Sequence, residues 1–249
     1  MRTARIVAGG RVQAARVEGK YLIAADGIRY EEDQVHWLAP VEPRNVIGLA
    51  LNYQNHAAEL GLDQPADPAI FLKPTSAVIG HRAPIRYPRG ASYCHYETEL
   101  AVVMGTPCRR VSPSQALEYV MGYTVANDFT CRDFVHNTFR PPVRAKGWDT
   151  FCPLGPTLIT PDEVADPGRL AITTTVNGEL RQQGTTAQMI RPIADIIAYL
   201  SEFMTLMPGD VILTGTPEGV SPVRPGDVIA CSVEKIGVLT NPVVEEELP

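Results

Sequence analysis

The sequence predicts a mixed fold in which strands dominate, with helices at the periphery and a small β unit at the N-terminus. Twenty-two prolines and 20 glycines divide the chain into many short segments, and both residues interrupt regular structure. Most of these segments are short apolar runs of strand length. The segment PIADIIAYLSEFMTL (192–206) instead carries apolar residues at helical spacing over a long window, and should be the longest helix.

The N-terminal 40 residues alternate short apolar runs with polar turns, in the order ARIVAGG, RVQAARVE and YLIAADG. This pattern is typical of antiparallel strands joined by tight turns. Pro40 and Pro43 then mark a linker. We therefore expect a small β domain over residues 1–40 and a larger domain over residues 44–249.

The first part of the larger domain predicts buried strands next to a short helix. VIGLALN (46–52) is an apolar run that suits a buried strand, and AIFLKP (69–74) suits a second one. Between them, YQNHAAEL (53–60) lacks helix breakers and predicts a helix. A loop rich in proline and aspartate follows it at 62–68.

Two central strands are predicted next, over ETELAVVMG (97–105) and MGYTVANDF (121–129). SPSQALEYV (112–120) should form a helix between them, capped by Ser112 or Ser114.

The C-terminal third returns to strands after the long helix. LAITTTVNGEL (170–180) predicts a hairpin with Asn177-Gly178 at its turn. Met207-Pro208-Gly209 should end the long helix. The segments DVILTGTPEG (210–219) and DVIACSVEKIGVLTNPVV (227–244) then supply the last strands.

Charge and hydropathy exclude several classes of protein. The net charge is -6 and no run of Lys or Arg is present, so a nucleic-acid partner is not expected. No apolar stretch reaches the length of a membrane-spanning helix, and the N-terminus lacks the apolar core of a signal peptide. We expect a cytoplasmic protein that does not bind membranes.

Five cysteines are scattered through the chain without a C-x-x-C pair: Cys94, Cys108, Cys131, Cys152 and Cys231. An odd, dispersed set argues against a disulfide framework and against a structural zinc site. We expect these cysteines to be reduced and mostly buried.

The segment CHYETEL (94–100) carries the strongest chemical signal. On a strand, alternate residues point to the same face, so His95, Glu97 and Glu99 should share one side. Two carboxylates on a half-buried strand repel each other, and a hard cation such as Mg²⁺ or Mn²⁺ relieves the repulsion. A solvated outer face carrying both acids fits the same pattern equally well. Asp128 offers a third ligand at the end of its strand, although an acid there is more often a turn or cap residue.

Two further sets of residues have the chemistry of a catalytic site. His56 and Glu59 lie three residues apart in the predicted helix, so the carboxylate can orient the imidazole for acid–base chemistry. Exposed helices often show the same pair. Lys146 lies in VRAKGWDTFCPLGP (143–156), where a lone lysine is usually a surface residue.

The glycine-rich segment LTGTPEG (213–219) lacks the lysine of a phosphate-binding loop. We expect a tight turn that presents the Thr216 hydroxyl.

Seven segments, taken in order, resemble the fumarylacetoacetate hydrolase family from about residue 44 onward. They are GLALNYQNHAAEL, FLKP, HYETEL, GYTVANDFTCRD, AKGWDTFCPLGP, VNGELRQQGTT and LSEFMTLMPGDVILTGTPEGV. The resemblance implies the β-roll of that family with peripheral helices, preceded by the small N-terminal β unit. It also implies a homodimer.

The resemblance assigns roles to individual residues. It makes Glu97, Glu99 and Asp128 the ligands of Mg²⁺ or Mn²⁺. It makes Lys146 an active-site lysine, and His56 and Glu59 a catalytic pair on a mobile lid helix. The substrate-binding positions that it implies are Arg132, Thr216 and Lys73.

The activity implied is metal-dependent chemistry on a small 2-oxo acid. NGELRQQGTT (177–186) and YLSEFMTLMPGD (199–210) most resemble the branch of the family that isomerises or decarboxylates unsaturated 2-oxo di- and tricarboxylic acids in 4-hydroxyphenylacetate (homoprotocatechuate) catabolism. A C–C hydrolase of acylpyruvates, and a binding module without turnover, are the alternatives on the same fold. The residues do not separate decarboxylation, isomerisation and hydrolysis, because one His–Glu pair can either donate a proton or activate a water.

Overall fold

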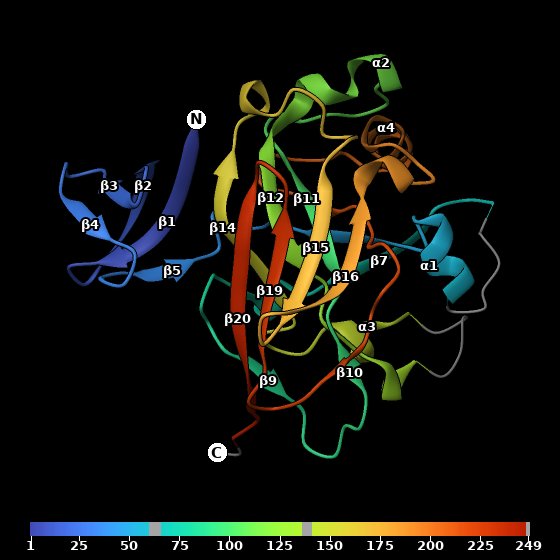
Figure 1. Cartoon of the computed structure of the whole chain (residues 1–249). Helices are drawn as coiled ribbons and strands as arrows, with labels where there is room; N and C mark the ends of the chain where they lie inside the picture. Colours follow the sequence, from blue (N-terminus) through green and yellow to red (C-terminus); the bar gives the residue numbers. More distant parts are fainter. Residues whose placement is uncertain (60–65, 136–140, 248–249) are drawn as a thin grey trace.

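The computed structural model describes residues 1–59, 66–135 and 141–247, and strands dominate this part of the chain (Figure 1). The described strands form a twelve-stranded, a five-stranded and a three-stranded sheet. The longest path through the large sheet runs β4-β3-β2-β1-β14-β12-β11-β17-β6-β7. The strand-dominated fold with peripheral helices is therefore confirmed. None of the described helices is long and apolar enough to cross a membrane.

The N-terminal strands form the antiparallel unit that the sequence predicts. They are β1 (Arg2–Ala8), β2 (Arg11–Glu18), β3 (Tyr21–Ala24), β4 (Arg29–Glu31) and β5 (His36–Leu38). Ile6, Leu22 and Trp37 pack together in a core cluster that belongs to this unit. The first residues of β1 also pair with β14 (Cys152–Ile159), so the unit extends the large sheet. The domain division at residues 40–44 stays a prediction.

The centre of the large sheet is β11 (Thr98–Met104), which lies between β12 (Val120–Asn127) and β17 (Val211–Leu213). Every residue of β11 is buried, because both faces of the strand are covered. β6 (Val46–Ala50) runs parallel to β17, and β7 (Ala69–Lys73) pairs with β6 at the edge.

The five-stranded sheet packs over one face of these central strands (Figure 1). Its members are β16 (Glu179–Thr185), β15 (Ala171–Val176), β19 (Val228–Val233), β20 (Gly237–Glu245) and β9 (Ile85–Tyr87). The hairpin between β15 and β16 turns at Asn177-Gly178, both with positive φ (53° and 82°). Two positive φ values are what a type I′ hairpin turn requires, and the predicted hairpin is confirmed.

The three-stranded sheet and the short helices complete the described fold. The sheet contains β10 (Cys94–His95), β13 (Thr130–Cys131) and β18 (Pro222–Val223), and β8 (Val78–Ile79) pairs with β14. The short helices are α1 (Gln54–Glu59), α2 (Pro113–Ala116) and α3 (Val143–Lys146). Single 3-10 turns are η1 (Thr75–Ala77), η2 (Leu117–Tyr119), η3 (Arg132–Phe134), η4 (Pro161–Glu163) and η5 (Thr186–Gln188). α1 confirms the predicted helix as far as Glu59; Leu60 lies outside the described residues.

The longest described helix, α4 (Ile193–Phe203), is the one that the sequence predicts, but it ends early. Met204 is already extended, and Leu206 makes a β-bridge with Cys108. Pairing with that neighbouring segment therefore ends the helix before Met207-Pro208-Gly209 is reached.

The prediction that Ser112 or Ser114 caps α2 is wrong, because no side chain makes a capping hydrogen bond to the first turn of this helix. Ser112 does occupy the N-cap position, but its hydroxyl donates to the Gln115 side chain at 2.8 Å rather than accepting from a backbone N–H.

Gly48 on β6 has no side chain, and the aromatic ring of Phe71 occupies the space next to it. Gly48 pairs with Phe71 of β7, and a Cβ built at Gly48 would lie 2.1 Å from Phe71 Cζ. Since no side chain stands there, the Phe71 ring lies across Gly48. The same ring has the Lys146 ammonium 4.8 Å from its centroid, a cation–π contact.

We expect Gly48→Ala to lower the free energy of unfolding by about 1–3 kcal/mol, because Phe71 must leave its rotamer. Urea unfolding measures this loss. The matched variant Gly48→Ala/Phe71→Leu should recover most of it relative to Phe71→Leu alone, since the smaller side chain clears the new methyl group. An unchanged urea midpoint for Gly48→Ala would show that the ring does not depend on this glycine.

Candidate metal centre

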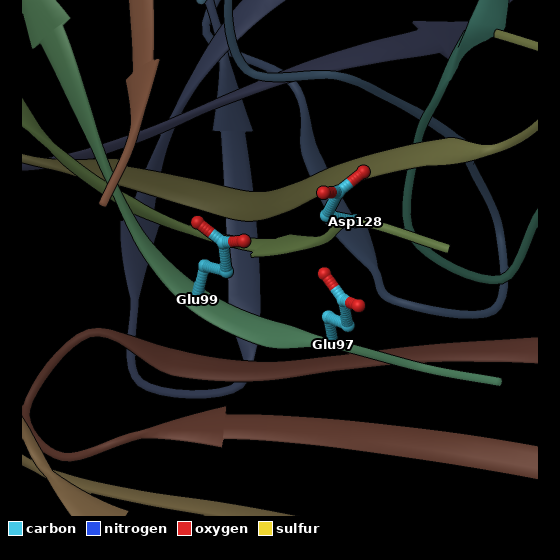
Figure 2. Close-up of side chains that lie close together, drawn as sticks. All are labelled: Glu97, Glu99 and Asp128. Carbon is cyan, nitrogen blue, oxygen red and sulfur yellow. The ribbon is translucent and has the colours of Figure 1, made fainter. Parts of the chain in front are cut away.

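Three buried carboxylates converge at the open end of the β11–β12 hairpin. Glu97, Glu99 and Asp128 each offer an oxygen within 4.8 Å of the others, and Figure 2 shows the three groups pointing toward one another. Glu99 lies on β11, Glu97 precedes that strand and Asp128 follows β12. The pairing of Thr98 with Asn127 brings them together, and the Asp128 N–H donates to the Glu97 carbonyl at 2.9 Å. The strand register therefore builds the cluster.

The surroundings of these acids differ from the expectation in two ways. The strand predicted through His95, Glu97 and Glu99 is broken, with His95 on β10 and Glu99 on β11. β11 is covered on both faces, whereas a half-buried strand was predicted. Glu97 is 5% exposed and Glu99 1%, so the alternative of a solvated outer face is wrong.

Two buried lysines balance part of this negative charge. Lys146 Nζ donates to Glu97 Oε2 at 2.9 Å and to Thr130 Oγ1 at 2.8 Å, and it pairs with Asp128 as well. Lys73 Nζ pairs with the second oxygen of Asp128. Lys146 is thus a buried residue of α3, and the interpretation of it as a surface lysine is wrong.

Of the three carboxylates, Glu99 makes no described ion pair with either lysine. Its described donor is the Gly215 N–H, 2.5 Å from Oε2. Burial raises the pKa of Glu99 well above its usual value, and the charges of Asp128 and Glu97 raise it further. Burial would also raise the pKa of Glu97, but Lys146, His95 and Arg132 outweigh burial and lower it.

The donor set fits a hard divalent cation. Three buried carboxylate oxygens within reach of one point are ligands of the kind that Mg²⁺ and Mn²⁺ prefer. A cation there would also relieve the repulsion that the raised pKa of Glu99 reports. The triad can therefore hold a metal ion.

Arg132 and His95 form a second polar group against Glu97. The Arg132 guanidinium donates through Nε to His95 Nε2 at 2.7 Å and through Nη2 to Glu97 Oε1 at 3.2 Å. His95 Nδ1 lies 3.0 Å from the Tyr96 carbonyl, so its proton resides on Nδ1. Burial lowers the pKa of His95 to about 4, which keeps it neutral. His95 is therefore a neighbour of the triad, as expected, and it also orients Arg132, which the sequence did not indicate.

The predicted pair His56 and Glu59 is formed on α1. His56 Nδ1 lies 3.0 Å from Glu59 Oε2, and Glu59 Oε1 accepts from the Gly219 N–H at 3.0 Å. Asn55 and Glu218 make a second bond between the same segments, at 3.0 Å. His56 is buried, while the Glu59 side chain is partly exposed. The pair is therefore formed with its imidazole buried and its carboxylate partly exposed, so the alternative of an exposed helix face is wrong for His56 alone.

Thr216 lies beside the triad, but its hydroxyl points into the protein, whereas we expected the turn to present it. Its hydroxyl donates to the Thr98 carbonyl at 2.9 Å and accepts from Gln182 Nε2 at 2.8 Å. It is 3% exposed. The segment does not present this hydroxyl, so a substrate-binding role for Thr216 stays a prediction. Gln182 has no signal in the sequence, because it lies in a strand that the sequence marks only as polar.

Tyr53 is a further polar residue that sequence reasoning missed. It is 1% exposed, and its hydroxyl has no hydrogen-bond partner in the described part of the chain. Burial raises its pKa and the Glu99 charge adds to this effect. A Cβ built at Gly215 would lie 3.4 Å from the Tyr53 ring, so the ring packs beside the residue that binds Glu99. The sequence offered no signal for it beyond its place before a short helix.

Residues 45–244 match the family described as fumarylacetoacetate (FAA) hydrolase C-terminal. This chain therefore belongs to the fumarylacetoacetate hydrolase family, and the resemblance and the fold class drawn from the seven segments are confirmed.

Two relatives are similar in sequence over most of this chain, and the name of the second indicates the branch. Protein Rv2993c of Mycobacterium tuberculosis is 46% identical over 215 residues, which are 86% of this chain and 81% of that protein. The 4-hydroxyphenylacetate degradation bifunctional isomerase/decarboxylase of Escherichia coli is 47% identical over 202 residues, which are 81% of this chain. The match covers 47% of that bifunctional protein, so this chain spans about half of its length.

Two solved structures share the whole fold. The 5-carboxymethyl-2-hydroxymuconate delta-isomerase of Mycobacterium smegmatis has a TM-score of 0.89 and 42% identity, and the match covers 100% of both chains. The maleylpyruvate hydrolase of Sphingobium sp. SYK-6, solved in complex with manganese (II) ion and pyruvate, has a TM-score of 0.86 and 31% identity. That match covers 99% of this chain and 100% of the hydrolase.

We expect Lys146→Met to destabilise the metal-free protein by about 3–5 kcal/mol, because it leaves Glu97 and Asp128 buried with less compensating charge. Urea unfolding in the presence of EDTA measures the loss. Lys20→Met, at an exposed lysine, is the control and should lie within about 0.5 kcal/mol of the unmodified protein. Equal stability of both variants in EDTA would mean that the Lys146 ion pairs make no net contribution to the free energy of unfolding.

Proposed function

We propose that this chain is a divalent-metal-dependent enzyme that decarboxylates or isomerises an unsaturated 2-oxo di- or tricarboxylic acid in 4-hydroxyphenylacetate catabolism. The observation that carries the proposal is the buried triad of Glu97, Glu99 and Asp128, with Glu99 outside the described ion pairs. The printed activities of the isomerase/decarboxylase relative and of the isomerase structure support the reaction class.

Mg²⁺ or Mn²⁺ is the proposed cofactor, with the triad as its protein ligands. The manganese in the maleylpyruvate hydrolase structure supports this choice for that fold. When bound, the cation supplies Lewis acidity to the keto oxygen and carboxylate of a 2-oxo acid.

Lys146 and Arg132 supply positive charge around the substrate. The Lys146 ammonium, fixed by Glu97, Asp128 and Thr130, stabilises negative charge that develops on the substrate oxygen. Arg132 keeps part of its side chain exposed while bound to His95 and Glu97, and it recognises a substrate carboxylate. Substrate binding by Lys73 and Thr216 belongs to the same proposal; the Lys73 ammonium pairs with Asp128, and the Thr216 hydroxyl donates to the Thr98 carbonyl.

His56 carries the proton between substrate carbons. Glu59 occupies Nδ1, which leaves Nε2 of the imidazole to accept and return a proton. Because Gly219 holds Glu59, the pair is oriented when α1 lies against the 214–221 segment. As a lid, α1 would exclude water from the site, because hydrolysis competes with decarboxylation.

A C–C hydrolase of acylpyruvates is the second candidate. The likeness to a maleylpyruvate hydrolase at TM-score 0.86 favours it, and His56–Glu59 can activate a water as readily as it moves a proton. The complete triad and dyad argue against the third alternative, a binding module without turnover.

A homodimer, a cytoplasmic location and a catalytic domain over residues 44–249 belong to the same proposal. Light scattering of the purified chain tests the first, and expression of residues 44–249 alone tests the last.

Product analysis tests the proposed reaction. The metal-stripped protein is supplied with Mg²⁺ or Mn²⁺ and given 5-carboxymethyl-2-oxo-hex-3-ene-1,7-dioate, 2-hydroxyhepta-2,4-diene-1,7-dioate or an acylpyruvate, while the ultraviolet absorbance of the conjugated system is followed. We expect CO₂ release or a shifted double bond without pyruvate. Pyruvate with a free acid would support the hydrolase, and no turnover of any of these substrates with either metal would overturn both enzyme proposals.

Two variants should separate metal binding from proton transfer. We expect Glu99→Gln to weaken Mn²⁺ binding, measured by calorimetry, and to abolish turnover. His56→Gln should keep Mn²⁺ affinity within about twofold and lower kcat by roughly 10²–10⁴-fold, because it removes only the acid–base group. His36→Gln, at an exposed histidine, is the control. Loss of Mn²⁺ binding in His56→Gln would contradict the assignment of His56 to proton transfer.

A further inference from the structure

Two cysteines face each other across the short strands next to the carboxylate cluster. Cys94 of β10 is the register partner of Cys131 of β13. The Arg132 N–H donates to the Tyr93 carbonyl at 2.8 Å, so the adjacent pair is a hydrogen-bonded one. Because bonded and non-bonded pairs alternate in an antiparallel ladder, Cys94 and Cys131 form a non-hydrogen-bonded pair. The Cys94 N–H accordingly bonds to the Tyr87 hydroxyl, at 3.3 Å.

The register of this pair is compatible with a disulfide. Cα atoms of a non-hydrogen-bonded pair are about 4.5 Å apart, and disulfides join Cα atoms at about 4.4–6.8 Å. The thiols already interact: their contact lowers the pKa of Cys131 and raises that of Cys94. Both are free thiols in the structure.

The other cysteines lack such a partner among the described residues. Cys152 lies on β14 and Cys231 on β19, while Cys108 bridges to Leu206. None of the three has a cysteine as its described register partner. Five buried cysteines therefore include one pair that is arranged for bonding.

We propose that Cys94 and Cys131 are a redox-active dithiol that a hydroperoxide converts into a cross-strand disulfide in the wall of the metal centre. The Cys131 sulfur attacks a peroxide oxygen and gives up its proton, the O–O bond breaks, and the departing oxygen takes that proton, so that a sulfenic acid and one water (or alcohol) result. The Cys94 sulfur then attacks the Cys131 sulfur; the S–S bond forms and the hydroxyl leaves as water with the Cys94 proton. Two thiols lose two electrons and two protons, and the peroxide is reduced.

The bond would enclose the whole carboxylate cluster in one covalent loop. Residues 94–131 contain Glu97, Glu99 and Asp128. The residues that follow the two cysteines, His95 and Arg132, bond to each other at 2.7 Å. Oxidation therefore ties together the two strands that carry the Arg132–His95 contact, in the register that they already have.

The enclosed loop should also stabilise the fold. Closing a loop of this length removes conformational entropy from the unfolded chain, and the midpoint of thermal unfolding should rise by about 5–15 °C. Two cysteines that merely fill space would give no such rise after oxidation.

Peroxide treatment followed by thiol mapping tests the proposal. The reduced, Mn²⁺-loaded full chain is incubated with hydrogen peroxide, unfolded in iodoacetamide and digested. We expect one linkage, between Cys94 and Cys131, alkylation of the three remaining thiols, and full reversal by dithiothreitol. Thermal unfolding of the treated protein should show the higher midpoint.

Matched variants test whether the linkage and the higher midpoint require Cys94 and Cys131. Cys94→Ser and Cys131→Ser should lose both the linkage and the rise in midpoint, whereas Cys108→Ser should keep both. Five alkylated thiols after treatment, a different or mixed pairing, or the same linkage without a higher midpoint would each overturn the proposal. Because these measurements do not depend on turnover, they stand apart from the test of the catalytic function.

Discussion

The site depends on the cost of placing three carboxylates at one buried point. Burial and mutual repulsion both favour protonation, and they raise the pKa of Glu99, while the pKa of Glu97 is lowered. The difference arises because Lys146 reaches Glu97 and Asp128 but makes no described ion pair with Glu99. The protein thus compensates much of the charge with its own cations, and Glu99 is the carboxylate without a described ion pair, where an external cation could bind. The ring of Phe71, the turn at Gly215 and the Arg132–His95 contact all support this arrangement.

The His56–Glu59 pair is organised separately from the carboxylate triad. His56 and Glu59 come from α1, and their anchor is a backbone N–H at Gly219 rather than a charged residue. A neutral donor leaves the Glu59 carboxylate free to stabilise the imidazolium. The two sets of side chains therefore come from separate elements of the chain, α1 for one and the β11–β12 hairpin for the other.

Local patterns in the sequence predicted the parts of this structure that depend on local chemistry. The Asn177-Gly178 turn, the apolar runs of β6, β11 and β12, and the periodic α4 follow from residue type and spacing. Glu97 and Glu99 were recognisable as a pair, but their burial was not, because a sheet packed from elsewhere in the chain covers the second face of β11. The early end of α4 and the inward hydroxyl of Thr216 have the same origin: each depends on a partner that is distant in sequence, Cys108 and Gln182 respectively. Only the family resemblance indicated a role in the site for Asp128 and Lys146. Spacing alone predicts a turn residue at Asp128 and a surface lysine at Lys146.

The position of the triad on its hairpin has a consequence for how the chain can be altered. Glu97 and Asp128 lie where β11 begins and β12 ends, while the connection through residues 105–119 leaves from the opposite end of both strands. Strand pairing, and not the length of that connection, sets the separation of the ligands. The exposed residues of that connection are therefore a natural place to attach a peptide or a fluorophore, whereas Cys108 and Ala116 are buried in the core and hold the segment against the rest of the fold.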